Sequence, residues 1–236
     1  MLWASAAVMG GVSLQEAKGV VWQMLTMTSI GRAGYISFFA ITLVLAVRTL
    51  RSTTAWREWS VLVALSVFVF VRASMGHAGE NGYWTLPFAV EVIHLTAMGA
   101  WTGLVVVSAW KAVGAHTGQP DLNRTAHYLD SMSAAAMAAV IAVFVTGLFN
   151  AWHRVGTADN LLGGSIYTTA LWVKVCLVSV ALILGGYNKV FGLARARHSV
   201  SGLRSVRLVL MVESAVLLAV LIAAAVLTSQ QPPAAM

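Results

Sequence analysis

The stretch that decides the fold is Pro87-Phe-Ala-Val-Glu91-Val-Ile-His94-Leu-Thr-Ala-Met98-Gly-Ala-Trp101-Thr-Gly-Leu-Val-Val-Val-Ser-Ala-Trp110. It is almost wholly apolar and exceeds the roughly 20 residues that a helix needs to cross a bilayer. Glu91 and His94 interrupt the apolar run, and residues three apart share one face of a helix. Because an ionisable side chain inside a membrane span is costly, this pair indicates a functional site.

The composition of the whole chain agrees with a membrane protein. Of its 236 residues, 59% are hydrophobic and only 10% are charged, whereas soluble domains carry about 25% charged residues. The formal net charge is +7, but the cations lie in short segments between apolar runs, where they set membrane topology. The sequence therefore predicts an integral membrane protein that does not bind nucleic acid.

Six apolar runs predict an all-α fold, a polytopic bundle of transmembrane helices. We expect the spans near residues 32–50, 57–75, 85–110, 131–153, 167–188 and 205–228. Residues 1–30 predict a partial helix or an amphipathic helix at the membrane surface. The predicted organisation is this N-terminal segment, a six-helix transmembrane domain over residues 31–230, and a short tail over 231–236.

The charges of the connecting segments predict the orientation. One side holds Arg48, Arg51, Arg57, Lys111, Arg124, Lys189, Arg195, Arg197, Arg204 and Arg207, and the other holds chiefly Lys18, Arg32 and Arg154. The positive-inside rule makes the first side cytoplasmic. Both chain ends then face outward, and the polar residues near the span ends converge on the outer half of the bundle.

Several of these outer residues are possible copper ligands. The candidate metal ligands are Met75, His77, Glu91, His94, Met98 and His153, and further polar candidates are Glu80, Asn150 and Lys174. Copper(II) favours imidazole and carboxylate, whereas copper(I) favours thioether and imidazole. His77, His94 and Glu91 would suit the oxidised ion, and either methionine with the histidines would suit the reduced ion, so both states stay open.

Each candidate also has a structural interpretation. Glu91 and His94 could be a hydrogen-bonded pair that ties two helices together, and Met98 is more often a core residue than a ligand. Thr146 and Asn150 lie on one helix face with His153; Asn150 suits an interhelical hydrogen bond, and His153 suits a contact with lipid headgroups. Lys174 could extend to the interface or act as the counter-ion of Glu91.

Three further expectations concern residues outside this set. Cys176 is expected to be an inert core thiol within a span, and Glu213 is expected to pair with a neighbouring arginine. Five glycines are candidates for close helix approach, namely Gly99, Gly103, Gly147, Gly185 and Gly186.

Three motifs resemble the CopD family, the copper resistance D proteins of the bacterial inner membrane. They are GHAGENGYWTLPFAVEVIHLTAMGAWTG at residues 76–103, TGLFNAWHRV at 146–155, and YTTALWVKVCLVSVALILGGYN at 167–188. By position, His77, Glu91, His94, Asn150 and Lys174 match the family's polar motif residues. Glu91 stands where the family usually has Asp, which keeps the chemistry, and we expect the additional N-terminal spans of longer members to be absent.

The resemblance implies a membrane protein that handles periplasmic copper with a copper-binding periplasmic partner. It is not expected to be an enzyme, since no nucleophile with a paired base and no nucleotide-binding motif is present in the sequence. One alternative is a redox protein with haem b between His94 and a histidine such as His153. Another is a structural subunit, as a homo-oligomer or within a larger membrane complex.

Overall fold

The computed structural model describes Gly19, Trp22 and residues 26–50, 54–79, 82–112, 122–157, 160 and 166–228. Most of the predicted N-terminal segment over residues 1–30, the candidate Glu80 and the predicted tail over 231–236 lie outside these residues.

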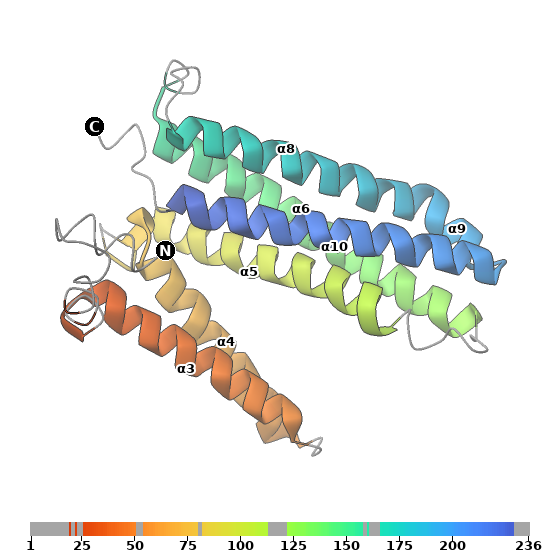
Figure 1. Ribbon diagram of the computed structural model, residues 1–236, viewed down its shortest axis with the longest axis horizontal. Coiled ribbons are helices and arrows are strands. Elements are labelled where there is room, and N and C mark those ends of the chain that lie inside the picture. Colours follow the sequence, from red (N-terminus) through yellow and green to blue (C-terminus); the bar gives the residue numbers. More distant parts are fainter. Residues whose placement is uncertain are drawn as a thin grey trace. The chain divides into compact units, whose positions relative to one another are not determined.

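Helices make up nearly all of the described chain (Figure 1). The long ones are α3 (Ser29–Thr49), α4 (Ala55–Ser74), α5 (Leu86–Val107), α6 (Leu122–Val155), α8 (Ile166–Tyr187) and α10 (Val200–Thr228). Shorter ones are the 3₁₀ turn η1 (His77–Gly79), the π-helical turns η2 (Ser108–Ala112) and η4 (Asn188–Gly192), and α9 (Leu193–Ala196). The predicted all-α class is confirmed.

Five of the six long helices are long and apolar enough to cross a membrane: they cover Gly31–Thr49, Leu86–Lys111, Arg124–Val155, Ile166–Ala196 and Val200–Leu227. The sixth, α4, was predicted as a span but falls outside this set. It carries Glu58 in its first turn and Arg72 in its last, and Arg57 lies beside Glu58. Its uninterrupted apolar stretch is therefore shorter than the helix.

Two compact units make up the chain, Met1–Val92 and Ile93–Met236, and the division falls inside α5. In the first unit, α3 and α4 form a helical hairpin. Arg57 closes it, because its Nε donates to the Val47 carbonyl at 3.1 Å and its guanidinium also reaches the Arg48 carbonyl at 3.3 Å. Arg48 in turn pairs with Glu58 at 3.1 Å.

The segment between α4 and α5 is held at both ends within the first unit. Gly79 lies against α4, where an added Cβ would be 2.7 Å from the Ser74 carbonyl oxygen, and Gly82 has a positive φ of 97°. Both positions favour glycine, which explains two glycines of the GHAGENG motif. Phe70 of α4 packs with Tyr83 and Phe88, with ring centroids 5.2–5.5 Å apart.

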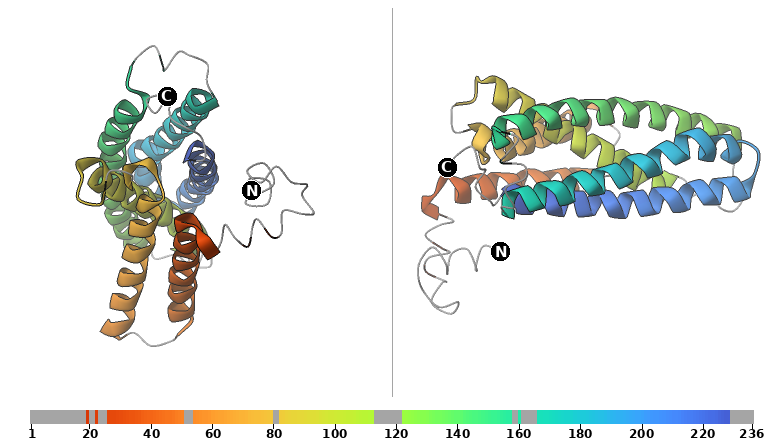
Figure 2. Two further views of the ribbon diagram at one scale, coloured as in Figure 1. Left: turned by 90° about the vertical axis from the view of Figure 1, so that its left-hand side faces the viewer. Right: turned by 90° about the horizontal axis from the view of Figure 1, so that it is seen from above.

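In the second unit, α5 runs antiparallel to α6 and to α10 (Figure 2). His94 contacts Thr146 near one end of the α5–α6 pair, and the Ser108 hydroxyl contacts the Tyr128 hydroxyl at 2.9 Å near the other. Early residues of α5 thus lie beside late residues of α6. The same order holds against α10, where the Arg207 Nε donates to the Ala109 carbonyl at 3.2 Å.

The helix α8 packs along α10, also in the antiparallel sense. The Asn188 amide donates to the Val206 carbonyl at 3.5 Å, and Gly185 lies against Glu213. We refer below to the two ends of this bundle as the Val155 end, where α6 finishes and α8 begins, and the Val200 end, where α10 begins.

A large hydrophobic cluster joins the helices of this unit, and it includes Trp101, Val105, Leu210, Leu217 and Val220. A smaller cluster consists of Val155, Tyr167, Leu171 and Leu227. Large apolar side chains also cover the outside, for example Phe144, Ile183 and Ile222, which are 66–70% exposed. Helices that are apolar on all faces are typical of a membrane bundle.

Candidate functional site

The centre of the candidate site is His94, which lies inside the bundle with 6% of its surface exposed. Its Nδ1 lies 2.9 Å from the Oγ1 of Thr146 on α6. This contact ties α5 to α6, as the structural interpretation of His94 requires, although the partner is Thr146. The sequence placed Thr146 on the polar face of α6 but did not identify it as the partner of His94.

The hydrogen bonds of Thr146 determine which nitrogen of His94 carries the proton. The threonine hydroxyl has one proton, and it donates this proton to the Ala142 carbonyl at 2.5 Å. Thr146 therefore accepts from His94, and Nδ1 is the protonated nitrogen. The backbone carbonyl of Val143 also acts on this ring. Nε2 is then left with a free lone pair, the form in which imidazole binds metals.

Gly147 provides the space for the His94 ring. A Cβ added at Gly147 would lie 3.4 Å from the His94 Cε1 and 3.9 Å from Nδ1. Thr146 therefore accepts the hydrogen bond from His94. The next residue, Gly147, leaves room for the ring because it has no side chain. Of the five glycines predicted to allow close approach, only Gly147 and Gly185 do so, and Gly99, Gly103 and Gly186 would have nothing within 4 Å of an added Cβ.

The electrostatic surroundings of His94 are positive. The charges of Lys174 on α8 and Arg154 on α6 both act on its ring. Glu91 lies on α5 three residues before His94, so the two share a helix face, and Glu91 is buried with 8% of its surface exposed. The predicted roles of Lys174 as a counter-ion and Glu91 as a ligand stay predictions.

The remaining predicted residues are spread more widely. Met75 caps α4 and is partly buried, and His77 begins the turn η1. Met98 lies in the hydrophobic core with 5% exposed, as its structural interpretation predicted. His153 is exposed, and its ring stacks on Phe149 with 5.9 Å between centroids and 13° between planes.

Among the described residues, no three His, Cys, Asp or Glu side chains form a group able to hold a metal ion. The structure therefore gives one well-oriented imidazole, with Glu91 one turn away on the same helix. Asn150, on the same face of α6 as Thr146, is partly buried. The prediction of a core thiol at Cys176 is wrong, because this free cysteine is exposed on α8.

A second buried polar group was misassigned from the sequence. Glu213 was expected to pair with an arginine, but its hydrogen-bond partner is the Trp101 indole, whose Nε1 donates to Oε1 at 3.3 Å. Glu213 is 2% exposed, and an added Cβ at Gly185 would lie 3.2 Å from Oε1. Three helices, α5, α8 and α10, thus meet at this carboxyl group.

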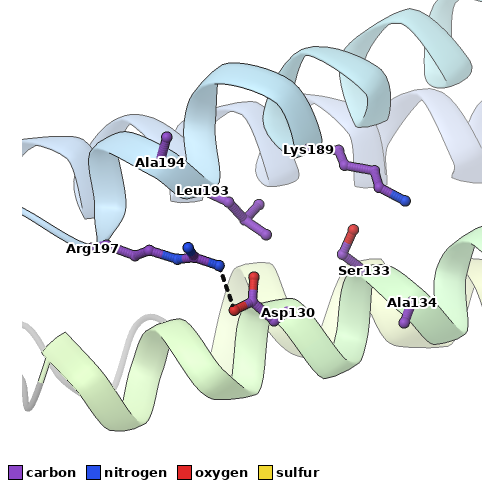
Figure 3. Close-up of a pocket in the computed structure, with 7 residues that line it drawn as sticks. All are labelled: Asp130, Ser133, Ala134, Lys189, Leu193, Ala194 and Arg197. Carbon is purple, nitrogen blue, oxygen red and sulfur yellow. Dashed lines mark hydrogen bonds and ion pairs between the residues drawn. The ribbon is translucent and has the colours of Figure 1, made fainter.

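A pocket of about 270 Å³ lies between the early part of α6 and the η4–α9 segment (Figure 3). Its polar lining comes from Asp130 and Ser133 of α6, Lys189 of η4 and Arg197. Arg197 donates to the Asp130 carboxylate at 2.7 Å. The helix α6 begins at Leu122, before the span predicted near 131, and it contacts α9.

Comparison with known proteins supports a relation to copper handling. Residues 126–227 match the family model "CopD: Copper resistance protein D". The chain is 26% identical over 240 aligned residues to the "Copper transport protein CutJ" of Bacillus subtilis, an alignment that covers 98% of this chain and 40% of that protein. The chain thus spans less than half the length of that relative. No solved structure matches.

The two matches cover different parts of the candidate site. The family model includes Thr146, Gly147 and Glu213 but begins after α5, whereas the alignment with the Bacillus protein includes almost the whole chain. Together they confirm the resemblance that the three motifs predicted.

Proposed function

We propose, on the premise that this chain belongs to the CopD family of copper resistance proteins, that it binds copper through His94 and moves it across the bacterial inner membrane. The relative's printed name concerns copper transport, and the chain has helices apolar enough to span a membrane. Copper is the substrate in this proposal and enters the bundle from the Val155 end.

The observation that carries the proposal is the hydrogen bond between His94 and Thr146. It fixes the imidazole of a membrane helix with its Nε2 lone pair available. Metal-binding histidines commonly donate their other nitrogen to an acceptor that orients the ring.

The distribution of charge supports entry from the Val155 end. The described cations at the Val200 end are Lys111, Arg124, Lys189, Arg195, Arg197, Arg204 and Arg207, against Arg154 and Lys174 near the Val155 end. By the positive-inside rule the Val200 end is cytoplasmic. His94 then lies about 12 Å along α5 from Leu86, in the outer half of the membrane.

We further propose that Glu91, one helical turn from His94 on α5 and toward the outer surface, takes part in copper coordination during transfer. The candidate ligands Met75 and His77 stay predictions from the sequence. Carboxylate and imidazole suit copper(II), and thioether and imidazole suit copper(I). A periplasmic copper-binding protein would deliver the ion to this side.

The test is copper binding by the purified protein in detergent, compared between the wild type, His94→Ala and His127→Ala. His127 is the matched control, because it is an exposed histidine near the opposite end of α6. We expect near-stoichiometric copper in the wild type and in His127→Ala, and a large loss in His94→Ala.

Equal copper content in the wild type and His94→Ala would contradict the proposal. A visible Soret band in copper-free protein would favour the haem alternative. Wild-type protein with neither copper nor haem, after copper has been offered, would favour a structural subunit.

A further inference from the structure

Glu213 lies deep in the bundle, in a region that the copper-binding proposal does not use. It is thirteen residues along α10 from Val200, which corresponds to about 20 Å of helix, and a similar length follows it to Thr228. Its side chain is 2% exposed. The carboxyl group therefore lies near the middle of the predicted membrane thickness.

The surroundings of Glu213 hold the carboxyl group without neutralising it. Trp101 donates one hydrogen bond at 3.3 Å, and Gly185 allows α8 to approach within contact of both carboxyl oxygens. An indole N–H carries no net charge. Burying an ionised carboxylate without a cation is costly, so this site suits a carboxyl group that carries a proton.

The other charged and titratable groups of the surrounding elements occupy other positions along their helices. They are Glu91 and His94 on α5, Lys111 on η2, Arg124, His127, Tyr128, Asp130, His153 and Arg154 on α6, Tyr167, Lys174, Cys176 and Tyr187 on α8, Lys189 on η4, Arg195 on α9, Arg197 and His198 before α10, and Arg204 and Arg207 on α10. In the described part of the chain, the side-chain hydrogen bond of Glu213 comes from Trp101. Arg207, on the same helix, donates instead to the Ala109 carbonyl.

Glu213 also lies on the path that a cation bound at His94 would follow. Trp101 is seven residues beyond His94, two turns along the same face of α5, or about 10 Å. A cation that passes from His94 toward the Val200 end therefore reaches the level of Glu213. At that depth its charge requires compensation.

We propose that Glu213 is a proton-binding site that exchanges its proton for the charge of the transported cation, an inference that rests on the proposed copper function. The carboxyl group releases one H⁺ to water and becomes a carboxylate as the cation arrives at its level. The single negative charge offsets one positive charge of the ion. When the cation leaves, the carboxylate takes up one H⁺ again, so protons and charge balance over the cycle.

The first experiment needs no copper. Infrared difference spectra of the full-length protein in detergent at neutral pH would compare the wild type with Glu213→Gln and Glu58→Gln. Glu58 is the matched control, because its side chain is 50% exposed at an end of α4. We expect the C=O band of a protonated carboxyl group in the wild type and in Glu58→Gln, and its loss in Glu213→Gln.

A second variant keeps this test decisive if Glu213→Gln does not fold. Trp101→Phe retains the carboxyl group and removes its donor, so the C=O band should shift in frequency while remaining present. A wild-type spectrum without a protonated carboxyl band, or a band unchanged in both Glu213→Gln and Trp101→Phe, would overturn the proton site.

The second experiment measures proton release when copper is added, as Cu(II) or as Cu(I) with ascorbate, in weakly buffered solution. Metal binding commonly releases protons from ligands, so the difference between the wild type and Glu213→Gln isolates this carboxyl group. We expect about one proton fewer per copper in Glu213→Gln, and a copper affinity that depends less on pH than that of the wild type.

The outcomes separate the two proposals. Equal proton release in the two proteins, with copper bound by both, would overturn the exchange and leave the copper site standing. A carboxyl band that disappears in Glu213→Gln, in a protein that binds no copper, would support the proton site and overturn the copper function and the exchange.

Discussion

The replacement Thr146→Val is the sharpest test of how His94 is prepared for copper. Valine has nearly the shape of threonine but lacks the oxygen that accepts from the His94 Nδ1 at 2.9 Å. A buried donor that loses its acceptor costs about 1–3 kcal/mol. Loss of a hydrogen bond that orients a metal-binding histidine lowers metal affinity by about 10- to 100-fold.

The lower part of that range is expected here. The backbone carbonyl of Val143 also acts on the His94 ring, so it offers an alternative acceptor when Thr146 is replaced. We therefore expect copper affinity to fall by about tenfold, which corresponds to about 1.4 kcal/mol. Thr146→Ser keeps the hydroxyl group and should bind copper as the wild type does.

Competition against a coloured copper chelator would measure the three affinities in detergent, and thermal unfolding would show that each variant is folded. Wild-type affinity in Thr146→Val would refute the reasoning, because the orienting hydrogen bond would then have no effect on copper. A tenfold loss in both variants would refute it as well, since the serine retains the acceptor.

Four other replacements test the packing and the pocket. Gly147→Ala would place a Cβ 3.4 Å from the buried histidine ring, and we expect copper affinity to fall several-fold, as measured by the same competition assay. Gly185→Ala would place a Cβ 3.2 Å from Oε1 of Glu213, and we expect thermal unfolding to show a loss of about 1–3 kcal/mol in stability. Gly186→Ala is the control: nothing lies within 4 Å of its added Cβ, so its stability should be unchanged or slightly higher. Asp130→Asn removes the ion pair with Arg197, in which the Asp130 side chain is 41% exposed and that of Arg197 is 53% exposed. Stability should therefore change by less than about 1 kcal/mol, and copper binding should not change. A large loss of stability or of copper binding would show that the pocket has a greater role than its exposure indicates.

The sequence predicts the helices of this protein well, because each corresponds to a long apolar run. Its errors concern polar turns at the helix ends. Arg124 and Asp130 predict a connecting segment by composition, yet they lie within α6 because the first turns of that helix pack on α9 and pair with Arg197. Charged residues at both ends of α4 likewise shorten its apolar stretch, so it is not among the five helices that qualify as spans.

The candidate site is less accessible to sequence reasoning, because its contacts depend on the register between helices. Spacing alone places Glu91 and His94 on one face of α5, and Thr146 on one face of α6. It does not show that His94 and Thr146 meet, or that the partner of Glu213 is an indole 112 residues away in sequence. The glycines illustrate the same limit, because only the two that face a neighbouring polar side chain allow close packing.

The π-helical turn at the end of α5 has a consequence for insertions and deletions. A π-helical turn closes its hydrogen bond one residue later than an α-helical turn and so accommodates one additional residue. Loss of one residue between Ser108 and Ala112 would return this turn to α geometry and leave the preceding helix unchanged. Loss of one residue between His94 and Trp101 would instead rotate the two side chains by about 100° relative to each other, so that they could no longer contact Thr146 and Glu213 together. Variation in chain length is therefore expected to be tolerated at the Val200 end of α5 and excluded between these two residues.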